Sequence, residues 1–126
     1  MMVAKRVSLI LQILLYLVAG VNHFLNPDFY IRIIPQYIPY PQFMNAAAGV
    51  FEILFGLGLC FKTTRKWAAW GIVLMLTAFL PVHINMVINV PVVVGSITIS
   101  SLLVWLRLAL QPVLIFWAWW HTKDYA

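Results

Sequence analysis

Apolar residues fill most of this chain, in long runs separated by short clusters of polar residues, glycine or proline. Four runs approach the roughly 20 residues that a helix needs to cross the hydrocarbon of a bilayer. They cover residues 7–25, 42–61, 67–89 and 102–120. The pattern predicts an all-α fold: a bundle of four transmembrane helices that forms a single domain over residues 1–126.

The stretches between the runs differ from them in composition. Residues 26–41 are rich in proline and tyrosine, so we expect a short amphipathic helix on the membrane surface, with Asp28 as its N-cap, followed by an extended segment. Pro81 should kink the third span and leave the Thr77 carbonyl to another partner. Residues 91–101 are uncharged, and their placement stays open between a surface loop and the start of the fourth helix.

The first run follows Lys5 and Arg6 as a secretory signal would, but Val18-Ala19-Gly20 is a poor cleavage site. We therefore interpret the run as an uncleaved transmembrane helix. Its polar and small residues share one face, which suits the interior of a bundle. These residues are Gln12, Tyr16, Ala19, Gly20 and His23.

Composition and charge predict how the chain is oriented in the membrane. The chain is 64% hydrophobic and 9% charged, which excludes an ordinary water-soluble domain. Lys5, Arg6, Lys123 and a predicted tight basic turn over residues 62–66 fall on one side, and Asp28 and Arg32 on the other. The positive-inside rule then predicts a multi-pass inner (plasma) membrane protein with both termini in the cytoplasm. Because the basic residues flank apolar runs, the net charge of +5 indicates the lipid bilayer as the partner and not nucleic acid.

Glu52 is the main candidate for chemistry. It shares a helical face with Ala48, Gly49 and Gly56 in the middle of the second run. An acid at that depth must face the protein interior and find a donor there. Arg107 lies at a compatible depth in the fourth run, so we expect a Glu52–Arg107 pair. Gln111, one turn after Arg107, is placed to join it.

This pair has two interpretations. It could be structural and fix the register of the helices, or it could hold a polar small molecule. Asn22, His23, His83 and Asn85 are lesser candidates for the same buried polar cluster. His83 and Asn85 are two residues apart and cannot face one pocket. A bis-histidine haem is disfavoured because His23 and His83 lie at different depths and no attachment motif exists. A metal site formed by His23, Glu52 and His83 is disfavoured because no spacing within a helix supports it. The single cysteine, Cys60, excludes a disulfide or a CxxC pair. No catalytic motif is present, so the catalytic residues are unknown and enzymatic activity stays open.

Several segments resemble the DoxX family of membrane proteins. They are residues 20–30 (GVNHFLNPDFY), 34–39 (IPQYIP), 49–56 (GVFEILFG), 81–86 (PVHINM) and 105–111 (WLRLALQ). The resemblance implies a four-helix membrane protein linked to quinone-dependent oxidoreductase or oxidative-stress systems. Relatives of the DoxD type are associated with thiosulfate:quinone oxidoreductase, an activity that belongs to a complex with a partner subunit. The position of His83 often holds Asn in that family, which argues against histidine-specific chemistry.

We expect a DoxX-like membrane subunit that binds a quinone or another small amphipathic molecule at Glu52 and Arg107. No cofactor is evident from the residues themselves. The first alternative is a non-enzymatic scaffold whose basic turn docks an acidic soluble redox partner on the cytoplasmic side. The second is a small lipid-binding or isomerase-like protein similar to the emopamil-binding group. The small-residue faces would also suit a homodimer.

Overall fold

The computed structural model describes residues 3–35, 37–89, 92–94 and 97–123. The helices are α1 (Val3–Leu25), α2 (Pro27–Ile33), α3 (Pro41–Leu59), α4 (Lys62–Ala78), α5 (Leu80–Ile88) and α6 (Ser101–Trp120). Strands β1 (Val92–Val94) and β2 (Ile97–Ile99) form a small antiparallel hairpin. Within these described residues, four segments are long and apolar enough to span a membrane: α1, α3, α4 together with α5, and α6. The predicted all-α bundle of four spans is confirmed.

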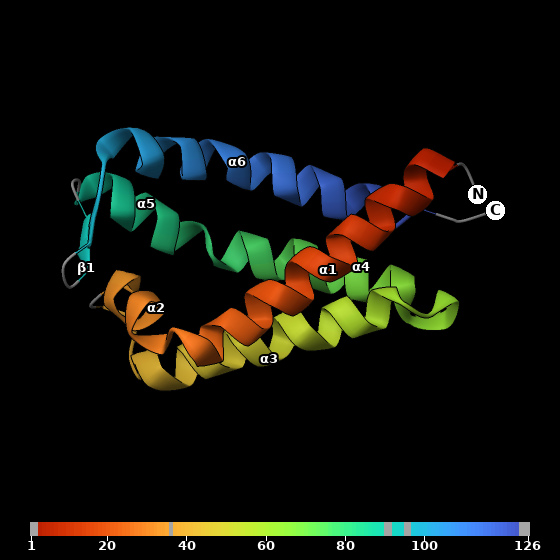
Figure 1. Cartoon of the computed structure of the whole chain (residues 1–126), viewed down its shortest axis with the longest axis horizontal. Coiled ribbons are helices and arrows are strands. Elements are labelled where there is room, and N and C mark those ends of the chain that lie inside the picture. The colour runs from red at the N-terminus through yellow and green to blue at the C-terminus, as the bar shows by residue number, and fades with distance from the viewer. Residues whose placement is uncertain (1–2, 36, 90–91, 95–96, 124–126) are drawn as a thin grey trace.

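The two ends of the bundle differ in what they carry (Figure 1). Both termini and the turn between α3 and α4 lie at one end, which we call the terminal end. Helix α2 and the hairpin lie at the opposite end, which we call the capped end. The surface segment expected between the first two spans is therefore present as α2.

The basic segment after α3 is helical, so the predicted turn over residues 62–66 is wrong. Helix α4 begins at Lys62, and the chain reverses at Cys60 and Phe61. The side chain of Arg65 is buried and donates from Nε to the Leu59 carbonyl at 2.9 Å and from Nη2 to the Cys60 carbonyl at 3.5 Å. A helix leaves its last carbonyls without backbone partners, and Arg65 satisfies two of them at the end of α3.

The third span is interrupted where Pro81 predicts it. Helix α4 ends at Ala78, Phe79 links the two helices, and Pro81 lies in the first turn of α5, where a missing N–H costs little. A carbonyl of α4 takes a partner from another helix, but it is that of Leu76 and not of Thr77. Gln111 Nε2 on α6 donates to it at 2.6 Å.

Two details at the capped end also differ from the sequence prediction. Asn26, and not Asp28, is the N-cap residue of α2, and its side chain makes no capping hydrogen bond. Residues 92–94 and 97–99 form the hairpin, whose register pairs Val92 with Ile99. Helix α6 then begins at Ser101, after Ser100 Oγ accepts a hydrogen bond from Leu103 N at 3.4 Å. Residues 91, 95 and 96 of the open stretch lie outside the described residues.

Helices α1 and α3 pack through small residues, as the sequence predicts. Gly20 is buried on α1, and Gly49 and Gly56 are buried on α3. A Cβ built on Gly49 would lie 2.9 Å from the Cβ of His23 and 3.0 Å from the Gly20 carbonyl oxygen. Side chains at these positions would push the helices apart, so the glycines permit the close approach that lipid-embedded helices need.

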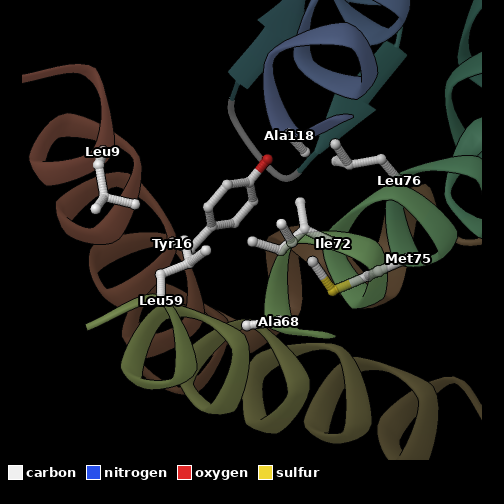
Figure 2. Close-up of a cluster of buried hydrophobic side chains, with 9 residues drawn as sticks. Leu9, Tyr16, Leu59, Ala68, Ile72, Met75, Leu76 and Ala118 are labelled. Carbon is white, nitrogen blue, oxygen red and sulfur yellow. The ribbon is translucent and has the colours of Figure 1, made fainter. Parts of the chain in front are cut away.

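A cluster of buried apolar side chains joins α1, α3, α4 and α6 (Figure 2). Its members are Leu9, Tyr16, Leu59, Ala68, Ala69, Ile72, Met75, Leu76 and Ala118. Toward the capped end the same helices enclose a cavity.

Candidate functional site

A cavity of about 870 Å³ lies in the capped half of the bundle. Residues from all six helices and from β2 line it, and most of them are aliphatic or aromatic. The polar side chains on its wall are His23, Tyr30, Asn45, Glu52, His83 and Arg107. A largely apolar cavity with a few converging polar groups is the usual form of a small-molecule site.

Glu52 pairs with a histidine of α1. His23 Nε2 lies 3.3 Å from Glu52 Oε2, and both side chains are buried. The contact has an ion-pair distance without hydrogen-bond alignment, since Oε2 is a buried atom with no hydrogen-bond partner among the described residues. The carboxylate thus keeps capacity to accept a bond from another group.

Asn45 holds the ring of His23 from the other side. Asn45 Nδ2 donates to the His23 carbonyl at 2.9 Å, which turns Asn45 Oδ1 toward His23 Nδ1 at 2.7 Å. Because Oδ1 can only accept, Nδ1 must carry a hydrogen. A proton must then sit on His23 Nε2 or on Glu52, or two lone pairs would oppose each other. The His23–Glu52 contact therefore holds a proton that either group can carry.

Tyr30 on α2 covers this pair. Its ring stacks on His23 with centroids 3.8 Å apart. Asn22 Nδ2 donates to the Tyr30 hydroxyl at 2.5 Å, and Asn26 Nδ2 donates to Asn22 Oδ1 at 2.6 Å. Asn22 does not line the cavity; it positions a residue that does.

Arg107 faces the cavity from α6 but is not the ion-pair partner of Glu52, so the predicted direct pair is wrong. Its Nη1 donates to Gln111 Oε1 at 2.9 Å, one turn along the same helix. Gln111 in turn is held by its bond to Leu76, so it orients the guanidinium and does not reach the carboxylate. Arg107 remains close enough to Glu52 for their charges to interact. The sequence prediction overlooked His23 as the nearer partner.

The two polar residues of α5 separate as expected. His83 lines the cavity, and its Nδ1 is buried without a hydrogen-bond partner among the described residues. Asn85 lies outside the cavity and accepts from Asn89 Nδ2 through its carbonyl, at 2.8 Å, and its Oδ1, at 3.1 Å. Four residues of the predicted cluster therefore line the cavity, namely Glu52, His23, His83 and Arg107. Gln111 and Asn22 hold residues of the cavity wall in place, and Asn85 lies outside the cavity.

The cavity has an apolar rim on the outside of the bundle. Phe51 on α3 and Leu74 on α4 line it and are also 50% and 70% exposed. A side chain that lines a cavity and is exposed lies at its mouth. In a bilayer, this mouth would face acyl chains and not water.

Sequence reasoning missed two residues of the site. Asn45 lies two turns before Glu52 on the same face of α3, so helical periodicity could have found it. Tyr30 carries no such signal, because only the packing of α2 brings it over His23. Among the described residues, no three of His, Cys, Asp or Glu gather in a way that could hold a metal ion.

Comparison with known proteins places the chain in a family. A family model described as "Domain of unknown function (DUF8561)" matches residues 12–122. No curated protein and no solved structure matches the chain.

Proposed function

Since the chain belongs to the family described as Domain of unknown function (DUF8561), we propose a function from the site itself: the protein binds one small amphipathic molecule within the membrane. The observation that carries the proposal is the apolar cavity of about 870 Å³ with polar groups gathered on its wall. Its volume falls in the range of about 300–1,000 Å³ that is usual for small-molecule sites.

The polar groups would hold the head of the molecule. Arg107 supplies N–H donors from α6, and His83 on α5 presents a buried ring nitrogen that has no hydrogen-bond partner among the described residues. The His23–Glu52 pair adds a proton that can be given or taken across 3.3 Å. A head with hydrogen-bond acceptors on two sides could therefore be bound from α5 and α6 by His83 and Arg107, and from α1 and α3 by the His23–Glu52 pair.

The apolar rim would receive the tail. Phe51 and Leu74 lie at the mouth, so a hydrocarbon chain could leave the cavity past these side chains and lie among the lipids. The molecule would then enter sideways from the bilayer, which suits a compound too apolar to cross water.

A quinone is the ligand class we favour. Its ring has two opposed carbonyl oxygens that accept hydrogen bonds, and its tail is hydrocarbon. The resemblance to DoxX-family proteins remains a prediction that also points to quinone-linked oxidoreductase or oxidative-stress systems. Electrons for such chemistry would have to come from a partner subunit, with Glu52 and His23 exchanging protons with the bound ring.

For the orientation, we infer an inner (plasma) membrane protein whose terminal end faces the cytoplasm. That end of the bundle carries the basic residues Lys5, Arg6, Lys62, Lys66 and Lys123. The capped end carries Asp28 and Arg32. This asymmetry supports the orientation through the positive-inside rule.

The scaffold alternative finds less support. A docking surface needs its charges free to meet a partner, but Arg65 is buried and bonded to the end of α3. Lys66 lies over the Trp67 ring, with Nζ 5.9 Å from its centroid. A soluble partner or a second copy of the chain would have to bind elsewhere or rely on Lys62 and Lys66.

The test is mass spectrometry of molecules that co-purify with the protein in mild detergent. We expect an amphipathic compound, with a quinone as the first candidate, to be retained by the wild type and lost from Glu52→Gln. The variant should still insert and keep its helical content. A wild type that retains no compound, together with a Glu52→Gln variant that fails to fold, would assign the cluster a purely structural role.

A further inference from the structure

Two polar side chains are buried in the apolar core, away from the cavity wall. Gln12 is 0% exposed and Tyr16 is 3% exposed. Both amide atoms of Gln12 and the Tyr16 hydroxyl have no hydrogen-bond partner among the described residues. Buried polar groups are seldom left unpaired, and ordered water is the usual partner where protein atoms do not serve. These residues therefore need partners other than the described side chains, and we call the row of polar residues to which they belong the polar line.

The residues of the polar line lie on one helix. Ser8, Gln12 and Tyr16 follow one another at intervals of four residues, which places them on one face of α1, about 6 Å apart along the axis. A gap of this size between polar side chains can be bridged by water.

One end of the line contacts polar groups of another element, and the other end lies near two charged side chains. At the terminal end, Ser8 Oγ lies 3.0 Å from His121 Nε2 and accepts from Trp117 Nε1 at 2.6 Å. At the other end, the Tyr16 hydroxyl lies close enough to Glu52 and Arg107 for their charges to act on it. Figure 2 shows the hydroxyl directed away from Leu9 and Leu59, toward the side of the cluster where Ala118 lies.

We propose that the Ser8–Gln12–Tyr16 face of α1 carries a chain of internal waters that conducts protons between the terminal end of the bundle and Glu52. The path is a further activity of the chain and does not depend on the identity of the bound molecule. It would give the buried acid access to one side of the membrane, while the cavity lies toward the other.

The transfer is a sequence of proton exchanges with no change of oxidation state. Each water releases one proton to the next acceptor as it takes one from the donor before it. Tyr16 does the same through its hydroxyl oxygen, and Gln12 holds a water in place without itself transferring a proton. The last proton replaces the one that the His23–Glu52 contact holds, after that proton has left toward the cavity, and it then sits on Glu52 or on His23 Nε2.

Carbodiimide labelling in proteoliposomes tests the path, because the reagent modifies only a protonated carboxyl. The full-length chain is reconstituted with acidic buffer on one side of the membrane and neutral buffer on the other. Cys60 is the sole cysteine and is exposed near the terminal end, so an impermeant maleimide marks the chains that present this end outward. Trypsin releases residues 33–62, which contain Cys60 and, as their sole acid, Glu52. One mass spectrum thus reports both orientation and protonation.

Two variants interrupt the path, and each has a matched control. Tyr16→Phe keeps the ring and removes the hydroxyl, and Gln12→Leu keeps the approximate volume and removes the amide. Tyr37→Phe and Gln42→Leu make the same changes at exposed positions outside the line. Circular dichroism confirms that each variant is folded before labelling.

In the wild type and the controls, Glu52 labelling should follow the pH at the terminal end. It should lose this dependence in Tyr16→Phe and in Gln12→Leu. Labelling that follows only the pH at the capped end, or that is absent under every gradient, overturns the proposal. So does a dependence that survives in the Tyr16→Phe variant, which is the milder change and the one less prone to misfold. If Gln12→Leu is more thermally stable than the wild type and its labelling is unchanged, the Gln12 amide binds no water and has no hydrogen-bond partner.

Discussion

Gly20 on α1 and Gly49 on α3 meet backbone to backbone, because a Cβ added to Gly20 would lie 2.8 Å from the Gly49 carbonyl oxygen. His23 and Glu52 each follow one of these glycines by three residues. The helix crossing and the His23–Glu52 contact are therefore parts of one arrangement, and spacing of the helices sets the geometry of the site.

Gly20→Ala should weaken this crossing. The new methyl group would also lie 2.6 Å from Ile53 Cγ1, and the facing carbonyl is backbone that cannot move alone. Overpacking of this kind typically costs about 1–3 kcal/mol. We expect a lower midpoint of unfolding in detergent, measured by circular dichroism, whereas Val21→Ala at an exposed neighbouring position should have a small effect. Equal stability of Gly20→Ala and the wild type would show that the helices can separate without loss.

Asn45→Ala should release the ring of His23. The bond to His23 Nδ1 and the bond to the His23 carbonyl both disappear, and leaving buried partners unpaired costs about 1–3 kcal/mol. Retention of the co-purified amphipathic molecule, measured by mass spectrometry per mole of protein, should fall while the helical content stays. Asn89→Ala removes an exposed asparagine that bonds only within α5 and its cap, and serves as the control. Full retention in Asn45→Ala would argue that His23 has no part in binding.

Gln111→Leu should destabilise the join between α4 and α6. The Leu76 carbonyl would lose its bond from Gln111, and Arg107 would lose its acceptor. We expect a loss of about 1–3 kcal/mol in the free energy of unfolding. Thr77→Val, which removes an exposed hydroxyl that bonds to its own helix, should change stability far less. Similar losses in both variants would contradict a specific role for the Gln111 bridge.

Ala48→Leu should fill part of the cavity without touching its polar groups. Ala48 lines the cavity, so a larger side chain would take the space of the ligand while the His23–Glu52 contact remains. Co-purified ligand should decrease several-fold. Ala109→Leu makes the same change at an exposed position of α6 and should retain the ligand. If Ala48→Leu binds as the wild type does, the ligand lies elsewhere.

His121 should make stability sensitive to acid. It lies after the end of α6 and is fully buried, and this burial, with the charges of Lys5 and Arg65, lowers its pKa to about 4. His121 takes up a proton near pH 6.5 in the unfolded chain, but only near pH 4 in the folded protein. Unfolding is therefore favoured as the pH falls through this window, by at most a few kcal/mol.

Unfolding midpoints in detergent between neutral pH and pH 4 would check this. His121→Asn should flatten the decline, whereas Lys123→Ala, an exposed neighbour, should leave it unchanged. An identical decline in His121→Asn would assign the acid sensitivity to other groups.

The spans could be read from the sequence because each is a local property. Runs of apolar residues fix where helices cross a bilayer, and the polar and small stripe from Gln12 to His23 fixes which face of α1 turns inward. The same periodicity correctly identified Glu52 as a buried acid on a face of small residues. A polar side chain on a helix in the membrane must face the protein interior, because the hydrocarbon offers it no hydrogen-bond partner.

The partner of the acid could not be read in this way. Depth and charge favoured Arg107, but His23 lies closer because Gly20 and Gly49 draw α1 and α3 together, while Gln111 holds the guanidinium on α6. The position of Tyr30 over His23 depends on how α2 folds back on the bundle. The amino-acid sequence determined which polar groups must be buried; only the tertiary structure decided which of them meet, because distances between helices depend on the packing of side chains far apart in the chain.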